Sequence, residues 1–485
     1  MPVVSILNRM NAGRTLGILG MLVLLPWGAP AADSDRLPVP IAQALKVHRL
    51  AARNLSLYVR EVGQPEPLLA VNADVPRNPA STMKLLTTLA ALEVLGPAYQ
   101  WRTEAWIDGE LADGRLDGNL YIKGYGDPSL VIEQFWRFLR GLRQAGLANV
   151  GGDLVVDQSY FNPAPGDPAE FDGRPLRAYN VMPSALLVNF QTVSLRFLPD
   201  AAAGRLHITA DPHPPRLEVD NRVRLTRGGC RGWGRQLAMR VVRDADVDRV
   251  IFTGRYPASC GENEVHRVLT DSTPYVAGVF RALWGELGGS LAGGSREAPV
   301  PGDARLLHRH VSPPLADIVR SINKFSNNVM TRQLLLTLGA ERSGAPGSDD
   351  QGIAALHDWL AEKGLDFPEL VVDNGAGLSR SERISARHLA ELVQAGLASA
   401  YMPEFLASLP LLGMDGTLQR RASASGPARL KTGSLDNVRS LAGVFTDRRG
   451  RQYAVAMLHN APRVEGYAGE AVQDALLEWL DAGVD

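Results

Sequence analysis

NPASTMKLLTT (residues 78–88) places a serine three positions before a lysine, at the start of an apolar helical pattern. Pro79 is typical of a first helical turn, where its missing N–H is not needed. Leucines then recur at helical spacing, which predicts a helix over 79–95. Because side chains three residues apart share one helix face, we expect Ser81 and Lys84 to meet near the N-terminus of this helix.

Lysine is scarce in this chain, which makes Lys84 informative. Only six of the 51 basic side chains are lysines. Arginine stays charged, whereas a buried lysine can lose its proton and act as a base. Free backbone N–H groups at a helix N-terminus also suit a developing oxyanion. The pair is therefore either an ordinary polar helix turn or a nucleophile beside its base.

The composition describes a globular protein with a substantial core. The chain has 485 residues, 45% of them hydrophobic, and a formal net charge of −1. This length predicts two or three domains, and the hydrophobic content argues against long disorder. Because there is no basic excess, nucleic acid is not an expected partner.

The N-terminus has the organisation of an export signal. Two arginines precede the apolar run LGILGMLVLL (16–25), and an A-x-A cleavage site ends at Ala31. The run is shorter than the ~20 residues of a membrane span, and an uncleaved anchor is the alternative. We expect residues 1–31 to be a cleaved signal peptide and the mature protein to be periplasmic, with at most a loose membrane association.

Cys230 and Cys260 are the two cysteines of the chain. In an oxidising compartment such a pair usually forms a disulfide. A structural bridge is expected, because no C-x-x-C spacing is present. Two buried free thiols are the alternative.

The predicted secondary structure changes in character twice along the chain. Residues 40–61 predict a short helix and a strand, whereas 104–300 consists of short alternating segments punctuated by turn residues. Helical periodicity returns afterwards, over 314–338, 350–363, 385–398 and 468–481. Three strands are predicted before the last helix, over 428–433, 438–446 and 452–459. The simplest organisation is a helix-and-sheet domain interrupted by a long β-rich insertion.

Two further polar clusters lie far downstream of the serine. SNN (326–328) is surrounded by apolar residues, which favours a cleft, although a polar pair at a helix boundary is the alternative. A hydroxyl there can pass a proton, and an amide can hold a carbonyl. KTGS (431–434) ends a predicted strand. Its glycine permits close approach to a ligand backbone, and its lysine and hydroxyls suit a carboxylate.

In this order the clusters match the S-x-x-K, S-D-N and K-T-G set of penicillin-binding proteins and class A β-lactamases. The sequence resembles the D-alanyl-D-alanine carboxypeptidase/endopeptidase family of the penicillin-binding protein 4 type, the class C low-molecular-mass penicillin-binding proteins. The long interval between Ser81 and Ser326 looks like that family's insertion, which a class A β-lactamase lacks. Further segments look familial: GNLYIKGYGDPSL (118–130), NGAGLSR (374–380), LPLLGMDGTL (409–418) and KTGSLDNVRSLAGVF (431–445).

The resemblance implies an α+β fold. A β-lactamase/transpeptidase-like domain, with a central antiparallel sheet flanked by helices, is expected from residues 32–103 and 302–485. The insertion over 104–301 is expected to form two β-rich subdomains.

The sequence departs from the family pattern at two positions. Its second motif reads SNN where many relatives have SDN, and Asn374 stands where relatives often carry Asp. Some relatives also place an acid near the diamino-acid side chain of the substrate. Asp172, within EFDGRPLRAYN (170–180), is the candidate for that role.

The resemblance also implies a function. It is that of a serine DD-peptidase, acting on D-Ala-D-Ala ends and on D-Ala–diamino acid cross-links of peptidoglycan stem peptides through an acyl-enzyme. β-Lactams would be covalent inhibitors, and no metal or cofactor is expected. The expected catalytic residues are Ser81, Lys84, Ser326 and Asn328. The expected substrate-binding residues are Lys431, Thr432, Gly433, Ser434 and Asp172.

Two other functions remain open at this stage. One is a serine β-lactamase or esterase of the same fold, and the other is a non-catalytic cell-wall binding protein. The intact set of serines, lysines and asparagine argues against the second. The sequence leaves the oligomeric state open.

Overall fold

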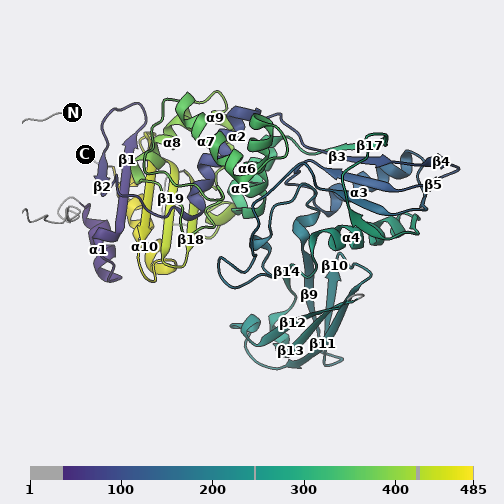
Figure 1. The fold of residues 1–485 in the computed structure, drawn as a ribbon. Helices are drawn as coiled ribbons and strands as arrows, with labels where there is room; N and C mark the ends of the chain where they lie inside the picture. Colours follow the sequence, from purple (N-terminus) through teal and green to yellow (C-terminus); the bar gives the residue numbers. More distant parts are fainter. Residues whose placement is uncertain (1–36, 245–246, 422–426, 484–485) are drawn as a thin grey trace, which may run out of the picture.

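A computed structural model describes residues 37–244, 247–421 and 427–483. The expected signal peptide, residues 1–31 with cleavage near Ala31, lies outside these residues. A body of helices and one sheet occupies one end of the molecule, and two β-rich arms extend from it (Figure 1). In the described part of the chain, no helix has both the length and the apolar character needed to cross a bilayer.

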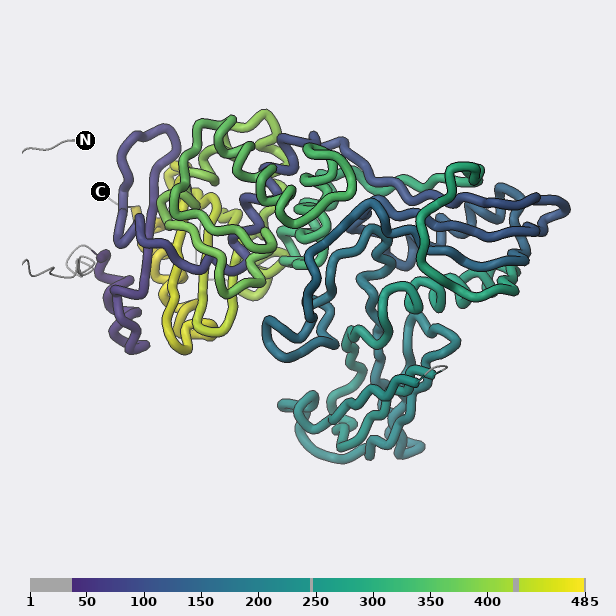
Figure 2. Tube along the Cα trace, viewed as in Figure 1, coloured from purple at the N-terminus to yellow at the C-terminus, as the bar shows by residue number. Residues whose placement is uncertain are grey.

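A five-stranded antiparallel sheet organises the body, in the order β18–β19–β20–β1–β2. Its strands are β1 (Leu55–Glu61), β2 (Leu69–Val71), β18 (Ala428–Leu435), β19 (Val438–Thr446) and β20 (Gln452–Asn460). Strands from both ends of the chain therefore lie side by side, as the purple and yellow traces of Figure 2 show. The KTGS strand β18 is at the sheet edge, where residues 410–412 pair with its first residues, 428–430, and the KTGS end follows this pairing.

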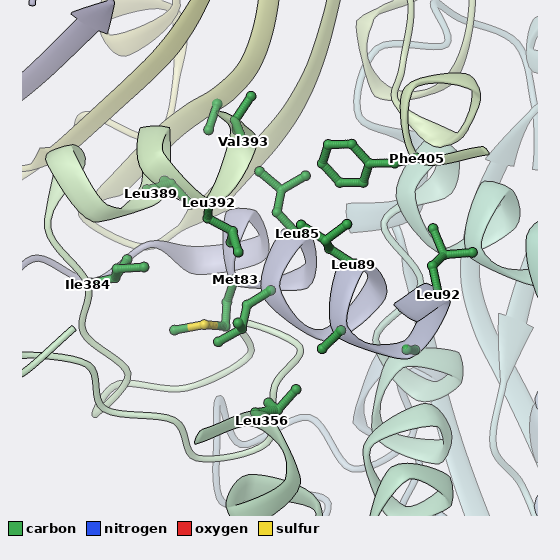
Figure 3. Close-up of a cluster of buried hydrophobic side chains, with 14 of the residues drawn as sticks. Met83, Leu85, Leu89, Leu92, Leu356, Ile384, Leu389, Leu392, Val393 and Phe405 are labelled. Carbon is green, nitrogen blue, oxygen red and sulfur yellow. The ribbon is translucent and has the colours of Figure 1, made fainter. Parts of the chain in front are cut away.

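Helices cover both faces of this sheet. Helices α1 (Val39–Val47) and α10 (Tyr467–Asp481) share a core with one face. The other face is covered by α2 (Lys84–Leu95), α5 (Leu315–Phe325), α6 (Asn328–Ser343), α7 (Asp349–Glu362), α8 (Ala386–Ala398) and α9 (Met402–Ser408). Four leucines of α2, Leu85, Leu86, Leu89 and Leu92, are fully buried in the core that these helices share (Figure 3). Burial on this scale fixes the helix that carries Lys84.

The insertion leaves and rejoins the body through two paired strands, β3 (Arg102–Ile107) and β17 (Arg305–Val311). They belong to a sheet in the order β16–β8–β6–β3–β17, and a smaller sheet in the order β15–β7–β5–β4 lies in the same arm. The other strands of these sheets are β4 (Glu110–Ala112), β5 (Arg115–Asp117), β6 (Leu120–Gly124), β7 (Asn149–Val150), β8 (Leu154–Asp157), β15 (Ser290–Leu291) and β16 (Ser295–Glu297). Helices α3 (Ile132–Gln144) and α4 (Ser272–Glu286) share their core.

The second arm contains two three-stranded sheets, in the orders β10–β9–β14 and β11–β13–β12. Their strands are β9 (Val193–Asp200), β10 (Arg205–Asp211), β11 (Leu217–Thr226), β12 (Leu237–Arg243), β13 (Asp248–Pro257) and β14 (Asn263–Arg267). Phe197 of one sheet stacks on Tyr256 of the other. Cys230 and Cys260 form a disulfide in this arm, which confirms the predicted pairing. The α+β class and the β-rich insertion are also confirmed, whereas the domain limits at residues 104 and 301 stay predictions.

Two predicted helices differ from the structure near the candidate site. The periodic stretch 314–338 divides into α5 and α6 at Ser326, whose φ of 57° is left-handed. Asn327 caps α6 by accepting the N–H of Met330. Both helices bury apolar residues in one core, so the periodicity continues across the break and hides it. The expected helix over 79–95 likewise begins as a 3-10 turn, Ala80–Met83, before α2.

Candidate active site

Ser81 lies in the 3-10 turn that precedes α2. The side chain of Asn78 holds this turn, because its Oδ1 accepts the N–H of Ala80 at 2.8 Å and its Nδ2 donates to the carbonyl of Ser379 at 2.8 Å. Ala80 has a left-handed φ of 45°, which is unfavourable for a residue with a Cβ. Such strain persists only where the surroundings impose it, so the position of Ser81 is firmly determined.

Lys84 is completely buried, and its Nζ contacts three oxygens. These are Ser81 Oγ at 3.1 Å, Asn328 Oδ1 at 2.6 Å and the carbonyl oxygen of Ala376. The last two can only accept hydrogen bonds, whereas a hydroxyl can also donate. A neutral amine satisfies all three, because it donates twice and keeps a lone pair for the Ser81 proton. The expected meeting of Ser81 and Lys84 is present in the structure.

Burial has a strong effect on the two motif lysines. It lowers the pKa of Lys84 to about 7, although the charge of Glu382 acts in the opposite direction. Burial also holds the pKa of Lys431 well below its ordinary value, and repulsion from Lys84 lowers it further. Burial thus disfavours the protonated form of each amine, and their repulsion disfavours protonation of both at once.

The second and third motifs meet beside Lys84. Lys431 Nζ donates to Ser326 Oγ at 2.9 Å and to the carbonyl of Thr432 at 2.8 Å. Ser326 accepts from Lys431, so its own proton remains available for donation. Since Asn328 Oδ1 already accepts from Lys84, the amide NH₂ of Asn328 is the part that can donate to a ligand.

Gly433 allows β18 to lie directly against the Ser81 turn. A Cβ built at this glycine would lie 2.8 Å from the Pro79 carbonyl oxygen and 2.8 Å from the Ser81 nitrogen, and closer still to Ser440 Oγ. No side chain fits in that space, so only glycine permits the approach. Ser434 follows at the exposed end of the strand.

A cavity of about 1250 Å³ connects the body with the insertion. From the body it is lined by Ser81, Ser326, Asn328 and Ser434, and from the insertion by Asp172, Tyr179 and Phe190. Asp172 accepts hydrogen bonds from Tyr179 Oη at 2.7 Å and Asn180 Nδ2 at 2.8 Å. Partial burial opposes ionisation of Asp172, but these hydrogen bonds lower its pKa overall. The three predicted motifs and an ionised Asp172 thus surround one space.

The segment NGAGLSR (374–380) resembles the family in sequence, but its contribution to the site was not predicted. The Ala376 carbonyl accepts from Lys84. Glu382 is completely buried, and its Oε1 accepts three successive backbone N–H groups, those of Asp373 at 3.3 Å, Asn374 at 3.1 Å and Gly375 at 2.9 Å. The role of a main-chain carbonyl cannot be recognised from the residue type. The two glycines beside Ala376 were the only hint in this segment that its backbone approaches another group closely.

Two other side chains at the site were also missed. Thr417 Oγ1 accepts a hydrogen bond from Thr432 Oγ1 at 2.8 Å, which ties the KTGS strand to the adjoining loop. Phe190 lines the cavity from a turn of three successive left-handed residues, 189–191. Neither the contact nor the turn has a signature in a single sequence.

Solved structures share this fold. Penicillin-binding protein 4 (dacB) from Haemophilus influenzae superposes with a TM-score of 0.72 at 22% identity, over 88% of this chain and 95% of that one. A predatory peptidoglycan endopeptidase from Bdellovibrio bacteriovorus gives a TM-score of 0.51 at 13% identity, over 89% of this chain and 93% of that one. At these identities the likeness concerns the fold, and it confirms the predicted transpeptidase-like domain with its insertion.

Sequence similarity identifies the family. The model of the D-Ala-D-Ala carboxypeptidase 3 (S13) family matches residues 39–483. The D-alanyl-D-alanine carboxypeptidase of Actinomadura sp. (strain R39) is 30% identical over 417 residues, 82% of this chain and 76% of the relative. The D-alanyl-D-alanine carboxypeptidase DacB of Haemophilus influenzae is 24% identical over 412 residues, 84% of this chain and 85% of the relative. The chain belongs to the S13 family of serine-type D-Ala-D-Ala carboxypeptidases, as its resemblance to the penicillin-binding protein 4 type predicted.

Gly433→Ala is expected to reduce carboxypeptidase activity about 100-fold, because a displacement of about 1 Å at reacting groups costs that much. The added methyl pushes β18 away from Ser81. D-Alanine release from a D-Ala-D-Ala peptide measures the effect, with thermal unfolding as the check on folding. Gly285→Ala is the matched control, since a Cβ there meets no atom within 4 Å. Full activity of Gly433→Ala would contradict the close approach.

Proposed function

We propose that this protein is a serine DD-peptidase that forms an acyl-enzyme on Ser81. Its substrates are the D-Ala-D-Ala ends and the D-Ala–diamino acid cross-links of peptidoglycan stem peptides, and penicillin acylates the same hydroxyl. The observation that carries the proposal is the 3.1 Å contact between Ser81 Oγ and a buried Lys84 whose other two partners are pure acceptors. This contact supports a nucleophile and its base, because a lysine held for structure alone would be expected to pair with a carboxylate.

In the acylation step, Ser81 Oγ attacks the carbonyl carbon of the first D-alanine, and Lys84 takes the hydroxyl proton. The backbone N–H groups of Ser81 and Ser434 stabilise the oxyanion of the tetrahedral intermediate. When this intermediate collapses, the C–N bond breaks and an ester to Ser81 remains.

The leaving nitrogen needs a proton, which Ser326 is suited to pass. Its oxygen accepts from Lys431, so its own hydrogen can go to the nitrogen while Lys84 replaces it. The proton that left Ser81 thereby reaches the amine product. Water then attacks the ester, the proton movements reverse, and the net reaction is peptide hydrolysis.

Binding of the substrate carboxylate would favour protonation of Lys431 over protonation of Lys84. Lys431, Thr432 and Ser434 would hold this carboxylate, whose negative charge raises the pKa of Lys431. Because the two amines repel each other, a protonated Lys431 favours a neutral Lys84. A substrate with a terminal carboxylate would thus favour the neutral form of Lys84, which can act as the general base.

The far wall of the cavity suits the rest of a stem peptide. The amide of Asn328 would donate to the acyl part of the substrate. Asp172 lines the same cavity as Ser81 and presents a carboxylate to the ammonium group of a diamino-acid side chain. This arrangement supports action on cross-links as well as on free D-Ala-D-Ala ends.

The proposed chemistry supports a location in the periplasm, where peptidoglycan is exposed to the enzyme. The N-terminal A-x-A pattern ending at Ala31 and the disulfide between Cys230 and Cys260 support export to an oxidising compartment.

Ser81→Ala is expected to abolish covalent labelling by a fluorescent penicillin, because no ester can form. Gel fluorescence after denaturation measures the label. Ser321→Ala is the matched control, since Ser321 also stands three residues before a lysine, Lys324, and it should label like the wild type. Equal labelling of Ser81→Ala would refute the nucleophile assignment, and rapid nitrocefin turnover by the wild type would favour a β-lactamase.

The rate of acylation is expected to rise with pH through a midpoint near 7, about tenfold between about pH 6 and pH 8. The sign follows from Lys84, whose pKa is lowered to about 7: below that pH the amine is protonated and cannot accept the Ser81 proton. Stopped-flow acylation by a chromogenic β-lactam gives the profile. Lys84→Arg, which stays protonated, should be inactive throughout, and a rate that falls with rising pH would exclude Lys84 as the base.

Incubation with purified peptidoglycan is expected to convert pentapeptides to tetrapeptides and to remove cross-linked dimers. Chromatography of the muropeptides measures both. Asp172→Asn removes the carboxylate but keeps the side-chain size, so it should slow cleavage of substrates with a free side-chain amine about tenfold or more, and a simple acyl-D-Ala-D-Ala peptide much less. Persistence of dimers with the wild type would exclude the endopeptidase activity.

A further inference from the structure

Lys84 depends on a carbonyl that belongs to a loop, not to a helix or strand. The Ala376 carbonyl is one of the three oxygens around its Nζ. The amine reaches Ser81 with its lone pair only if this carbonyl and Asn328 both occupy their positions. Whatever holds the loop over residues 373–377 therefore also holds the base.

The loop is built tightly against the serine turn. Thr87 of α2 donates to the Gly375 carbonyl at 2.7 Å, and the side chain of Asn374 accepts the N–H of Ala376 at 3.0 Å. Gly377 has a φ of 77°, and a Cβ there would lie 2.7 Å from the Ser81 nitrogen and would overlap the Ala80 carbonyl. A shift of this loop would therefore disturb both the nucleophile and its base.

Glu382 is the anchor of this loop. Its Oε1 accepts three consecutive backbone N–H groups, from residues 373–375, which form the kind of concave nest that binds anions. Its Oε2 is buried without a hydrogen-bond partner among the described residues. Such a carboxylate is costly to bury, and its hydrogen bonds are directed entirely to the backbone that presents the Ala376 carbonyl.

Glu382 also acts on Lys84 through its charge. Burial raises the pKa of Glu382 to about 7, against the effect of the loop N–H groups and with a further rise from Asp373. Its negative charge in turn favours the protonated form of Lys84. The amine of Lys431 on β18 also lies near Lys84, and the two repel each other. Arg383 is adjacent in sequence, but its guanidinium donates to the carbonyls of Arg380 and Glu382.

We propose that Glu382 is a positioning residue for the general base: its carboxylate gathers the loop N–H groups and so holds the Ala376 carbonyl on Lys84, and its negative charge acts on that amine. This role rests on the proposed function of Lys84. In this role a buried acid acts on the base through the loop and does not contact the substrate.

Glu382→Gln keeps the acceptor oxygen but removes the charge. The variant should still acylate with a β-lactam at high pH, within about threefold of the wild type, and the midpoint of its pH profile should move to lower pH because Lys84 loses the anion that favours its protonated form. Glu382→Ala also removes the acceptor, so its plateau rate should fall about 100-fold through misplacement of the base.

Glu369→Gln is the matched control. Glu369 precedes the same loop, but it accepts from Ser385 and contacts His388 instead of the loop N–H groups, so its pH profile should equal that of the wild type. Thermal unfolding of each variant separates a local effect from loss of the fold. A purely structural role for Glu382 would lower the folded fraction without moving the midpoint.

The proposal is overturned if Glu382→Gln acylates with an unmoved or raised midpoint, or if Glu382→Ala acylates at the wild-type rate. Such results would leave the proposed function intact, because both variants would still label at Ser81. Labelling of Ser81→Ala, by contrast, would refute the function itself. The two failures are therefore distinguishable.

Discussion

The buried amine of Lys84 is the constraint on which the rest of this site depends. Three segments far apart in the chain supply its oxygen partners: the Ser81 turn, the N-terminus of α6 at Asn328, and the loop at Ala376. Burial makes the charged form expensive, and two pure acceptors leave the neutral amine with one lone pair. Of these three partners, the Ser81 hydroxyl is the one that can also donate a proton.

The fold brings the edge strand β18 next to the turn and helix that carry Ser81 and Lys84. β18 can approach the serine turn because Gly433 has no side chain, and Lys431 then reaches Ser326. The insertion contributes a different part. It lines the opposite side of the cavity with Asp172 and Phe190, so the proposed catalytic groups lie on the body and the proposed substrate-selecting carboxylate lies on the insertion.

Much of the fold was predictable because its signals are local. The strands β18, β19 and β20 and the helix α2 follow periodicity and turn residues, and the three motifs follow residue type and order. The break at Ser326 was not predictable, because α5 and α6 bury one continuous apolar surface. The same holds for Ala376 and Glu382, whose contributions are a main-chain carbonyl and a set of backbone hydrogen bonds.

The sequence by itself determined the α+β class, the interrupted catalytic region, the cysteine pair and the candidate nucleophile with its base. These depend on patterns within short segments and on the order of motifs. Only the tertiary structure decided which groups surround Lys84, that Asp172 shares the cavity with Ser81, and that Glu382 holds the loop that contacts Lys84. Those relations join residues far apart in the chain, and burial and backbone hydrogen bonding, which decide them, arise only when the segments pack together.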